Sequence, residues 1–201
     1  NLQLNININQ LRKAIGHRIF LMPVIKSNAY GHGFLEIAKI LNKNREVDRI
    51  CVVNLDEAVF LIENKIVKKP IQILTFFEWD NNKVIMAINQ GVVFPVYSLE
   101  IAKKLNKIGK KCGKKVNIAI KIDTGASRIG FLPTDAIKNI KKIKTFKFVE
   151  ITDLFSHFAS SEEDNEQTKK QLSILNKIIF ELDTQNIKIK NKHIACTAGT
   201  I

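Results

Sequence analysis

Short apolar runs alternate with amphipathic helical patterns along the whole sequence, and this alternation restricts the possible fold more than any other feature. Seven apolar runs predict strands, at residues 19–25, 50–53, 71–76, 92–96, 116–122, 148–155 and 192–196. Between them, apolar residues recur at intervals of three and four, which is typical of helices with one buried face. Strands that alternate with helices indicate a parallel sheet against which the helices pack.

The alternation is compatible with an open doubly wound sheet or with a closed barrel. The first strand runs into the polar segment 26–33 rather than into a glycine-rich dinucleotide-binding turn, which favours the barrel. A complete barrel has eight strands and about 250 residues, whereas these 201 residues stop after the seventh predicted strand. We therefore predict an α/β fold, a TIM-type (β/α)8 barrel truncated after about strand seven, with residues 1–201 as one incomplete domain.

Four places in the sequence carry more detailed predictions. Residues 2–15 are expected to form an additional strand and helix before the first unit of the barrel. Ser98 and Thr134 each precede a helical pattern and are predicted to cap the helix N-termini. The long helix over 166–182 is expected to bury a stripe of apolar side chains, namely Leu172, Leu175, Ile179 and Leu182.

Charge and cysteine content narrow the classes of function. The net charge is +13, from 32 Lys and Arg against 19 Asp and Glu. The lysines are scattered over helical faces without zinc-finger spacing or an aromatic RNA-binding motif, so nucleic-acid binding is disfavoured. The three cysteines are far apart and lack metal-ligand spacing, so no metal is expected and a reducing compartment, the cytoplasm, is indicated. No apolar run approaches the roughly 18 residues of a membrane span, and no signal peptide is visible.

The leading candidate site residue is Lys26, at the end of the first predicted strand. Catalytic groups of (β/α) barrels gather at the carboxyl ends of the strands. A lysine amine in its neutral form can make a Schiff base with an aldehyde cofactor. Tyr30 can offer a hydroxyl to a phosphate group, and Gly31 and Gly33 permit a tight turn into the next helix.

Other strand ends carry polar residues of the same kind. Lys121 and Arg128 lie at the end of the fifth strand, His157 follows the sixth, and Thr197 follows the seventh. Taken singly, each has an ordinary alternative: a strand-edge charge, a surface ion-pair partner or a core histidine. Taken together, at the ends of several strands, they indicate a common site.

Three motifs in these places resemble those of a known family. Residues 26–33, Lys-Ser-Asn-Ala-Tyr-Gly-His-Gly, resemble the cofactor-lysine motif of alanine racemases, which are fold-type III pyridoxal-phosphate enzymes. Residues 121–131 resemble the second family motif, and residues 156–159, with the acidic residues that follow, resemble the third. The motifs occur in family order and at family-like spacing, and the resemblance covers essentially the whole chain.

The resemblance implies a role for each candidate residue. Lys26 would hold pyridoxal 5′-phosphate as a Schiff base and act as one of two catalytic bases. Tyr30 and Thr197 would contact the cofactor phosphate, and His157 would lie against the pyridine ring. Arg128 would bind the phenolic oxygen of the cofactor and orient the substrate, and Lys121 corresponds to a lysine that is often carbamylated in the family. The sequence departs from the family pattern at Cys196, where asparagine is usual, so the resemblance implies no role for that side chain.

The activity implied is the interconversion of L- and D-alanine by two-base proton transfer, which supplies D-alanine for peptidoglycan. In the family, the second base is a tyrosine from the C-terminal β-domain of the partner subunit. That domain is expected to be absent from this chain, which alone would then be inactive, while the complete protein would be a homodimer. The alternatives are a racemase of broader specificity, a related decarboxylase, and a non-catalytic gene remnant that at most binds the cofactor.

Overall fold

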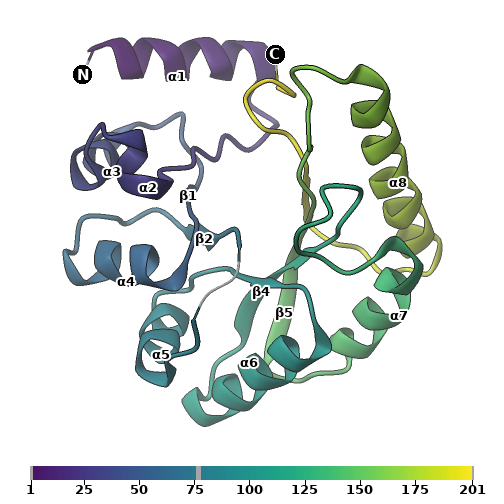
Figure 1. Ribbon diagram of the computed structural model, residues 1–201. Coiled ribbons are helices and arrows are strands. Elements are labelled where there is room, and N and C mark those ends of the chain that lie inside the picture. Colours follow the sequence, from purple (N-terminus) through teal and green to yellow (C-terminus); the bar gives the residue numbers. More distant parts are fainter. Residues whose placement is uncertain (1, 76–77, 201) are drawn as a thin grey trace. The chain divides into compact units, whose positions relative to one another are not determined.

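The protein is described by a computed structural model, which covers residues 2–75 and 78–200 (Figure 1). The chain forms two compact units, residues 1–94 and residues 95–201. Both units are built from parallel strands and helices, as the alternating pattern predicts. Among the described residues, no helix combines the length and the apolar character that a membrane crossing requires.

The first unit contains two short strands and five helices among its described residues. These are α1 (Leu2–Ile15), α2 (Lys26–Tyr30), α3 (Phe34–Lys43), β1 (Ile50–Val52), α4 (Leu55–Glu63), β2 (Ile71–Ile73) and α5 (Asn81–Asn89). The two strands are parallel, with Ile50 opposite Ile71. Helices α3 and α4 pack against β1, and α5 packs against α4. The strand expected over 71–76 is shorter than predicted, and its residue 76 lies outside the described residues.

The strand predicted over residues 19–25 is not regular. Its path is extended and parallel to β1, with an isolated bridge between Val24 and Cys51. Cys51 donates its N–H to the Pro23 carbonyl at 2.9 Å. Pro23 has no N–H, so it cannot donate a hydrogen bond to a neighbouring strand. The Leu21 N–H donates to the carboxylate of Asp48 at 2.8 Å instead of to a strand. The proline and this carboxylate together explain why the predicted strand is reduced to a bridge.

Residues 2–15 form one continuous helix, so the strand predicted at their start is wrong. One side of α1 is buried at Ile8 and Arg12, which are four residues apart and therefore lie on the same helical face. The Arg12 guanidinium donates to the Ile19 carbonyl at 2.6 Å and to the Asp48 carboxylate at 2.6 Å. This partly buried ion pair fixes the helix to the chain that follows it.

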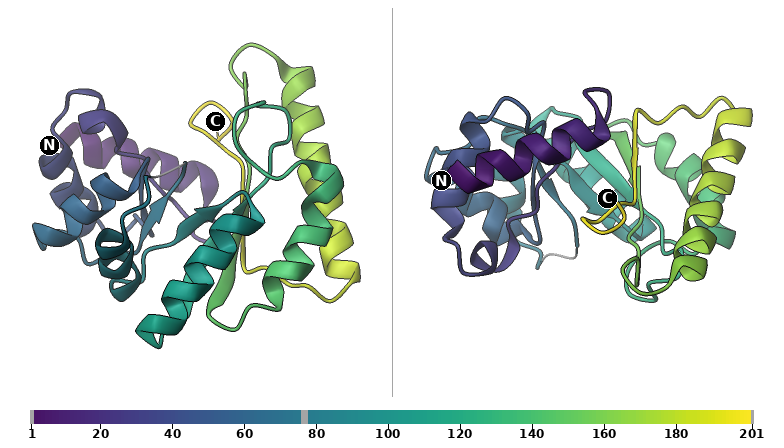
Figure 2. Two further views of the ribbon diagram at one scale, coloured as in Figure 1. Left: turned by 60° about the horizontal axis from the view of Figure 1, so that its bottom comes forward. Right: turned by 90° about the horizontal axis from the view of Figure 1, so that it is seen from above.

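The second unit contains a four-stranded sheet in the order β3-β4-β5-β6. Its elements are β3 (Phe94–Val96, which begins at the boundary), α6 (Leu99–Cys112), β4 (Val116–Lys121), α7 (Pro133–Lys144), β5 (Val149–Phe155), α8 (Asn165–Thr184) and β6 (Asn191–His193). Strands β4, β5 and β6 are parallel. Helices α6 and α7 pack against β5, and α8 packs against α7 (Figure 2).

Two of the predicted helix starts can be compared directly with the structure. The Ser98 hydroxyl accepts the Ile101 N–H at 3.2 Å, which confirms it as the N-cap of α6. The prediction for Thr134 is wrong, because α7 begins one residue earlier at Pro133, with Leu132 as N-cap. Proline suits the first helical position, where its missing N–H is not needed.

The buried stripe of α8 also differs from the prediction. The buried residues are Gln171, Leu175, Ile178 and Leu182. Leu172 is 40% exposed, and Ile179 is only partly buried. The observed stripe follows the helical period more closely than the predicted one, but it places a glutamine in the core.

The core of each unit consists of branched aliphatic and aromatic side chains. Fully buried in the first unit are Leu41, Ile50, Leu55, Leu61, Ile73 and Phe94. Fully buried in the second unit are Leu105, Ile118, Ile120, Ile122, Ile140 and Ile143. Polar residues follow where the strands end: Lys121 of β4 lies opposite Phe155 of β5 in the parallel register, so the loops after both strands leave the same edge of the sheet.

Candidate active site

Lys26 begins a strained turn at the end of the first extended segment. Helix α2 is not an ordinary helix, because Ser27, Asn28, Ala29 and Tyr30 have φ angles of 55°, 56°, 51° and 52°. All four are in the left-handed region, where a non-glycine residue costs roughly 1–2 kcal/mol. Four such residues in a row persist only where the surroundings hold them, and strain of this kind concentrates at functional sites.

Asn28 stabilises the turn with both its backbone carbonyl and its side chain. Its carbonyl accepts the N–H groups of Gly31 at 3.0 Å and Gly33 at 3.2 Å. Its side-chain oxygen accepts the Phe34 N–H at 2.7 Å, which satisfies a free donor at the start of α3. Both glycines have positive φ angles, 88° and 90°, as the predicted tight turn requires. No role was predicted for Asn28, although asparagine tolerates the left-handed region better than most residues.

The turn brings two of the predicted site residues together. The Nζ of Lys26 lies 5.6 Å from the centre of the Tyr30 ring. Tyr30 is 70% exposed, which leaves its ring and hydroxyl accessible, and Lys26 is partly buried. The first unit therefore presents an amine and a phenolic hydroxyl from the same side of one short turn.

In the second unit, Lys121 ends β4 in an apolar environment. The residue is only 4% exposed, and its Nζ lies 5.0 Å from the centre of the Phe155 ring. Burial, followed by the positive charge of Arg128, lowers the pKa of Lys121 from 10.5 to about 8. At pH 7 about a tenth of this amine is therefore uncharged, and an uncharged amine is a nucleophile.

Arg128 lies in a loop that is organised by the carboxylate of Asp123. That carboxylate accepts the backbone N–H groups of Gly125 at 3.0 Å, Ser127 at 3.0 Å and Arg128 at 2.8 Å. Burial acts to raise the pKa of Asp123, but these backbone donors outweigh it and the pKa lies below its usual range. Gly130 closes the loop, since a Cβ there would come within 2.3 Å of the Asp123 nitrogen. The structure thus brings Arg128 close enough to Lys121 for their charges to interact.

His157 follows β5, and its backbone is held by the buried Gln171 of α8. The Gln171 amide donates to the His157 carbonyl at 3.0 Å and to the Thr124 hydroxyl at 3.3 Å, and its oxygen accepts the Ala159 N–H at 2.9 Å. Gln171 is 1% exposed. It therefore joins the loops after β4 and β5, while the His157 side chain stays exposed. No role was predicted for Gln171, although a glutamine within the apolar period of a helix is a signal that the sequence contains.

Thr197 lies in a turn after β6. Its carbonyl accepts the Thr200 N–H at 3.0 Å, and its side chain is exposed. The neighbouring Cys196 lies 2.9 Å from Ser161, between the sulfur and the hydroxyl oxygen. Burial acts to raise the pKa of the Cys196 thiol, but the Ser161 hydroxyl and nearby backbone N–H groups lower it overall. Ala198 and Gly199 are among the residues that supply these N–H groups.

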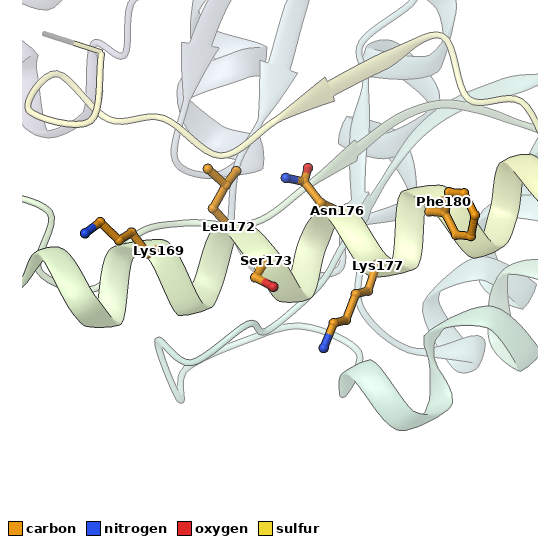
Figure 3. Close-up of a pocket in the computed structure, with 6 residues that line it drawn as sticks. All are labelled: Lys169, Leu172, Ser173, Asn176, Lys177 and Phe180. Atoms are coloured by element: carbon orange, nitrogen blue, oxygen red, sulfur yellow. The ribbon is translucent and has the colours of Figure 1, made fainter.

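A shallow hollow on α8 lies apart from these groups. Figure 3 shows that its lining comes from that one helix, namely Lys169, Leu172, Ser173, Asn176, Lys177 and Phe180. None of the predicted site residues is among them, so this hollow is not the candidate active site. Within residues 2–75 and 78–200, no cluster of three His, Cys, Asp or Glu side chains is arranged to hold a metal ion.

Comparison with known proteins identifies the family of this chain. A family model described as "Alanine racemase, N-terminal domain" matches residues 2–201. The chain belongs to the alanine racemase family. Its resemblance in three motifs is thus confirmed by a match that extends along essentially the whole sequence.

Individual alanine racemases show the same relationship. The protein of Methanococcus maripaludis is 35% identical over 197 residues, which are 97% of this chain and 52% of that protein. The protein of Clostridium kluyveri is 38% identical over 195 residues, 96% of this chain and 49% of that protein. The chain therefore spans about half the length of the curated relatives it matches.

Solved structures of alanine racemases show the fold. The structure of the Clostridium difficile 630 enzyme in complex with cycloserine matches with a TM-score of 0.90 and 33% identity, covering 100% of this chain and 54% of that one. The structure from Bacillus anthracis with bound L-Ala-P matches with a TM-score of 0.84 and 25% identity, covering 98% of this chain and 50% of that one. The predicted fold class, the α/β barrel domain of an alanine racemase, is confirmed.

Proposed function

We propose that the protein is a pyridoxal-phosphate-dependent alanine racemase that interconverts L- and D-alanine. The observation that carries this proposal is the placement of Lys26. Its amine stands at the start of a strained turn, 5.6 Å from the Tyr30 ring, in a chain that the alanine racemase model matches over residues 2–201. Family membership alone leaves the activity open, because the chain covers about half of each relative.

The chemistry of the available groups fits pyridoxal phosphate. Bound pyridoxal phosphate supplies an aldehyde that a lysine amine can hold and a ring that withdraws electrons from an attached α-carbon. Lys26 offers the amine, and the exposed Tyr30 hydroxyl offers a donor to a phosphate oxygen. In the second unit, the backbone N–H groups of Ala198 and Gly199 lie in the turn beside Cys196, and backbone donors of this kind can bind a phosphate. Thr197 adds an exposed hydroxyl to the same turn.

The remaining site residues would transfer protons and orient the substrate and the cofactor. Lys26 would remove or return the α-proton on one face of the substrate, because inversion needs a base on one side and an acid on the other. Arg128 would orient the substrate, and His157 would lie against the cofactor ring. The amine of Lys121 can add to CO2 with loss of one proton, which the low pKa of this lysine favours. The carbamate formed would place a negative charge beside Arg128.

The opposing acid is proposed to come from a partner subunit. A homodimer in the cytoplasm, with the tyrosine of a C-terminal β-domain reaching across the interface, would complete the two-base arrangement. Such an enzyme would supply D-alanine for peptidoglycan. This part of the proposal rests on the family to which the chain belongs.

The decisive experiment traps the cofactor and measures inversion. The protein, expressed from its natural reading frame, is incubated with pyridoxal phosphate, reduced with borohydride and mapped by peptide mass spectrometry. We expect the label on Lys26 and its loss in Lys26→Ala, whereas Lys39→Ala, a change of an exposed lysine on α3, should keep it. L-Alanine should yield D-alanine by chiral chromatography. Label on another lysine, or no D-alanine, would contradict the proposal, and faster inversion of another amino acid would indicate broader specificity.

A further inference from the structure

The carboxylate of Glu57 connects the Lys26 turn to the neighbouring strand end. One oxygen accepts the backbone N–H of Ser27 at 3.1 Å, and the other accepts the N–H of Val53 at 2.7 Å. Ser27 directly follows Lys26, and Val53 directly follows β1. Both donors belong to the first unit, as does α4, which carries Glu57 (Figure 1).

These two donors lie at the ends of neighbouring parallel segments. The extended chain before Lys26 runs beside β1, with Val24 opposite Cys51. An ionised carboxylate has two oxygens and only accepts hydrogen bonds, so it can hold both N–H groups at once. Hydrogen bonds to a charged acceptor are stronger than those between neutral groups. Glu57 therefore ties the backbone at Ser27 to the end of β1.

Glu57 is itself held in place at the start of its helix. The side chain of Asn54, the N-cap of α4, accepts the Glu57 N–H at 2.9 Å. In a common capping arrangement, a glutamate three residues into the helix reaches back to the N-cap N–H. Here the carboxylate reaches beyond that position to Val53 and Ser27. A residue in the first turn of α4 thus binds the backbone of Ser27, which lies outside that helix.

We propose that Glu57 is a positioning residue for Lys26. Its carboxylate fixes the first residue of the left-handed run, and through that peptide it fixes the direction in which Lys26 presents its amine. The role of Lys26 toward pyridoxal phosphate rests on the proposed function. The effect of Glu57 on the turn rests on the hydrogen bonds alone.

Two variants and a matched control test this proposal. Glu57→Ala removes both acceptors. Glu57→Gln keeps the size of the side chain, but its amide group can accept at only one of the two positions. Asp56→Ala is the control, since Asp56 lies beside Glu57 in the same helical turn and carries the same charge. It pairs with Lys83 at 2.6 Å on the surface, and no hydrogen bond joins it to the turn among the described residues.

The first readout is hydrogen exchange of individual backbone amides without cofactor. In Glu57→Ala, the amide of Ser27 should exchange about ten-fold faster than in the wild type, which corresponds to the loss of one charge-assisted hydrogen bond. Glu57→Gln should accelerate exchange at Ser27 or Val53, and it keeps the test open if Glu57→Ala fails to fold. Asp56→Ala should leave both amides unchanged. Wild-type exchange at Ser27 in both Glu57 variants would overturn the proposal.

The second readout is the rate at which pyridoxal phosphate attaches to Lys26, followed by the visible absorption of the adduct. We expect this rate to fall about ten-fold in each Glu57 variant whose Ser27 amide exchanges faster, measured well below the unfolding transition of that variant, and to stay at the wild-type value in Asp56→Ala. Faster exchange at Ser27 with a wild-type rate of attachment would show that the hydrogen bond only supports the fold, and would overturn the proposal. A wild-type protein that forms no adduct on Lys26 would refute the proposed function, while the exchange experiment would still report on Glu57.

Discussion

Replacing Lys121 by methionine should stabilise the protein at neutral pH. The lysine is 4% exposed, and burial together with Arg128 lowers its pKa from 10.5 to about 8. A difference of one pH unit in pKa corresponds to about 1.36 kcal/mol, so the lowered pKa means that keeping this side chain protonated costs the folded state about 3 kcal/mol. The Phe155 ring, 5.0 Å from Nζ, offsets about 1 kcal/mol by cation–π attraction. We therefore expect Lys121→Met to raise the free energy of unfolding by about 2 kcal/mol.

The pH dependence of this gain has a defined sign. Because the pKa of Lys121 is lower in the folded state, the unfolded chain binds the additional proton between about pH 8 and pH 10.5. The stability of the wild type therefore rises with pH across this window. Below it, both states carry the proton and the cost is constant. The advantage of Lys121→Met should be full near neutral pH and should fade as the pH approaches 10.5.

Urea unfolding followed by circular dichroism measures both effects. Wild type and Lys121→Met are compared near neutral pH and near the upper end of the window, in buffers depleted of CO2 so that the amine stays unmodified. Lys115→Met is the control, because Lys115 forms an exposed ion pair with Glu150 at 3.1 Å, and such pairs contribute at most about 1 kcal/mol. The reasoning is refuted if Lys121→Met is less stable than wild type at neutral pH, or if its advantage does not change with pH.

Three further predictions concern the loops of the second unit. Gln171→Leu should lower the free energy of unfolding by about 3 kcal/mol in a urea titration, because it leaves several buried polar partners unsatisfied; a loss below about 1 kcal/mol would contradict this. Gly130→Ala should cost at least about 2 kcal/mol by the same assay, since its Cβ would meet the Asp123 nitrogen at 2.3 Å, and wild-type stability would disprove that clash. Cys196, whose pKa is lowered, should react with iodoacetamide faster than Cys112 near neutral pH; peptide mapping that shows the reverse order would count against the described turn.

The order of elements could be predicted from the sequence because hydrophobic periodicity reflects burial directly. Runs such as 116–122 and 148–155 became β4 and β5 within one residue at each end. The segment 19–25 has a similar apolar content, but Pro23 and the carboxylate of Asp48 remove the ladder hydrogen bonds that a regular strand needs. Periodicity does not report on such individual donors and acceptors.

The candidate site was accessible to sequence reasoning only in part. Charged or phenolic side chains at the ends of buried strands indicate a functional site, and this allowed the choice of Lys26, Tyr30, Lys121 and Arg128. The groups that hold their backbones were less accessible. Glu57 looks like an ordinary residue of an amphipathic helix, and for Gln171 the only signal was its place in the apolar period of α8. Their roles depend on which distant N–H and C=O groups they meet, and only the folded chain shows this.

The left-handed run from Ser27 to Tyr30 has a consequence for attempts to improve this protein by selection. Glycine, and to a lesser degree asparagine, would adopt these backbone angles at lower cost than serine, alanine or tyrosine. A library screened for thermal resistance alone should therefore accumulate such residues here, and Ser27→Gly would loosen the backbone next to Lys26. Under the proposed function, the most heat-resistant clones would retain pyridoxal phosphate poorly, so a screen at this segment should select on cofactor retention together with temperature.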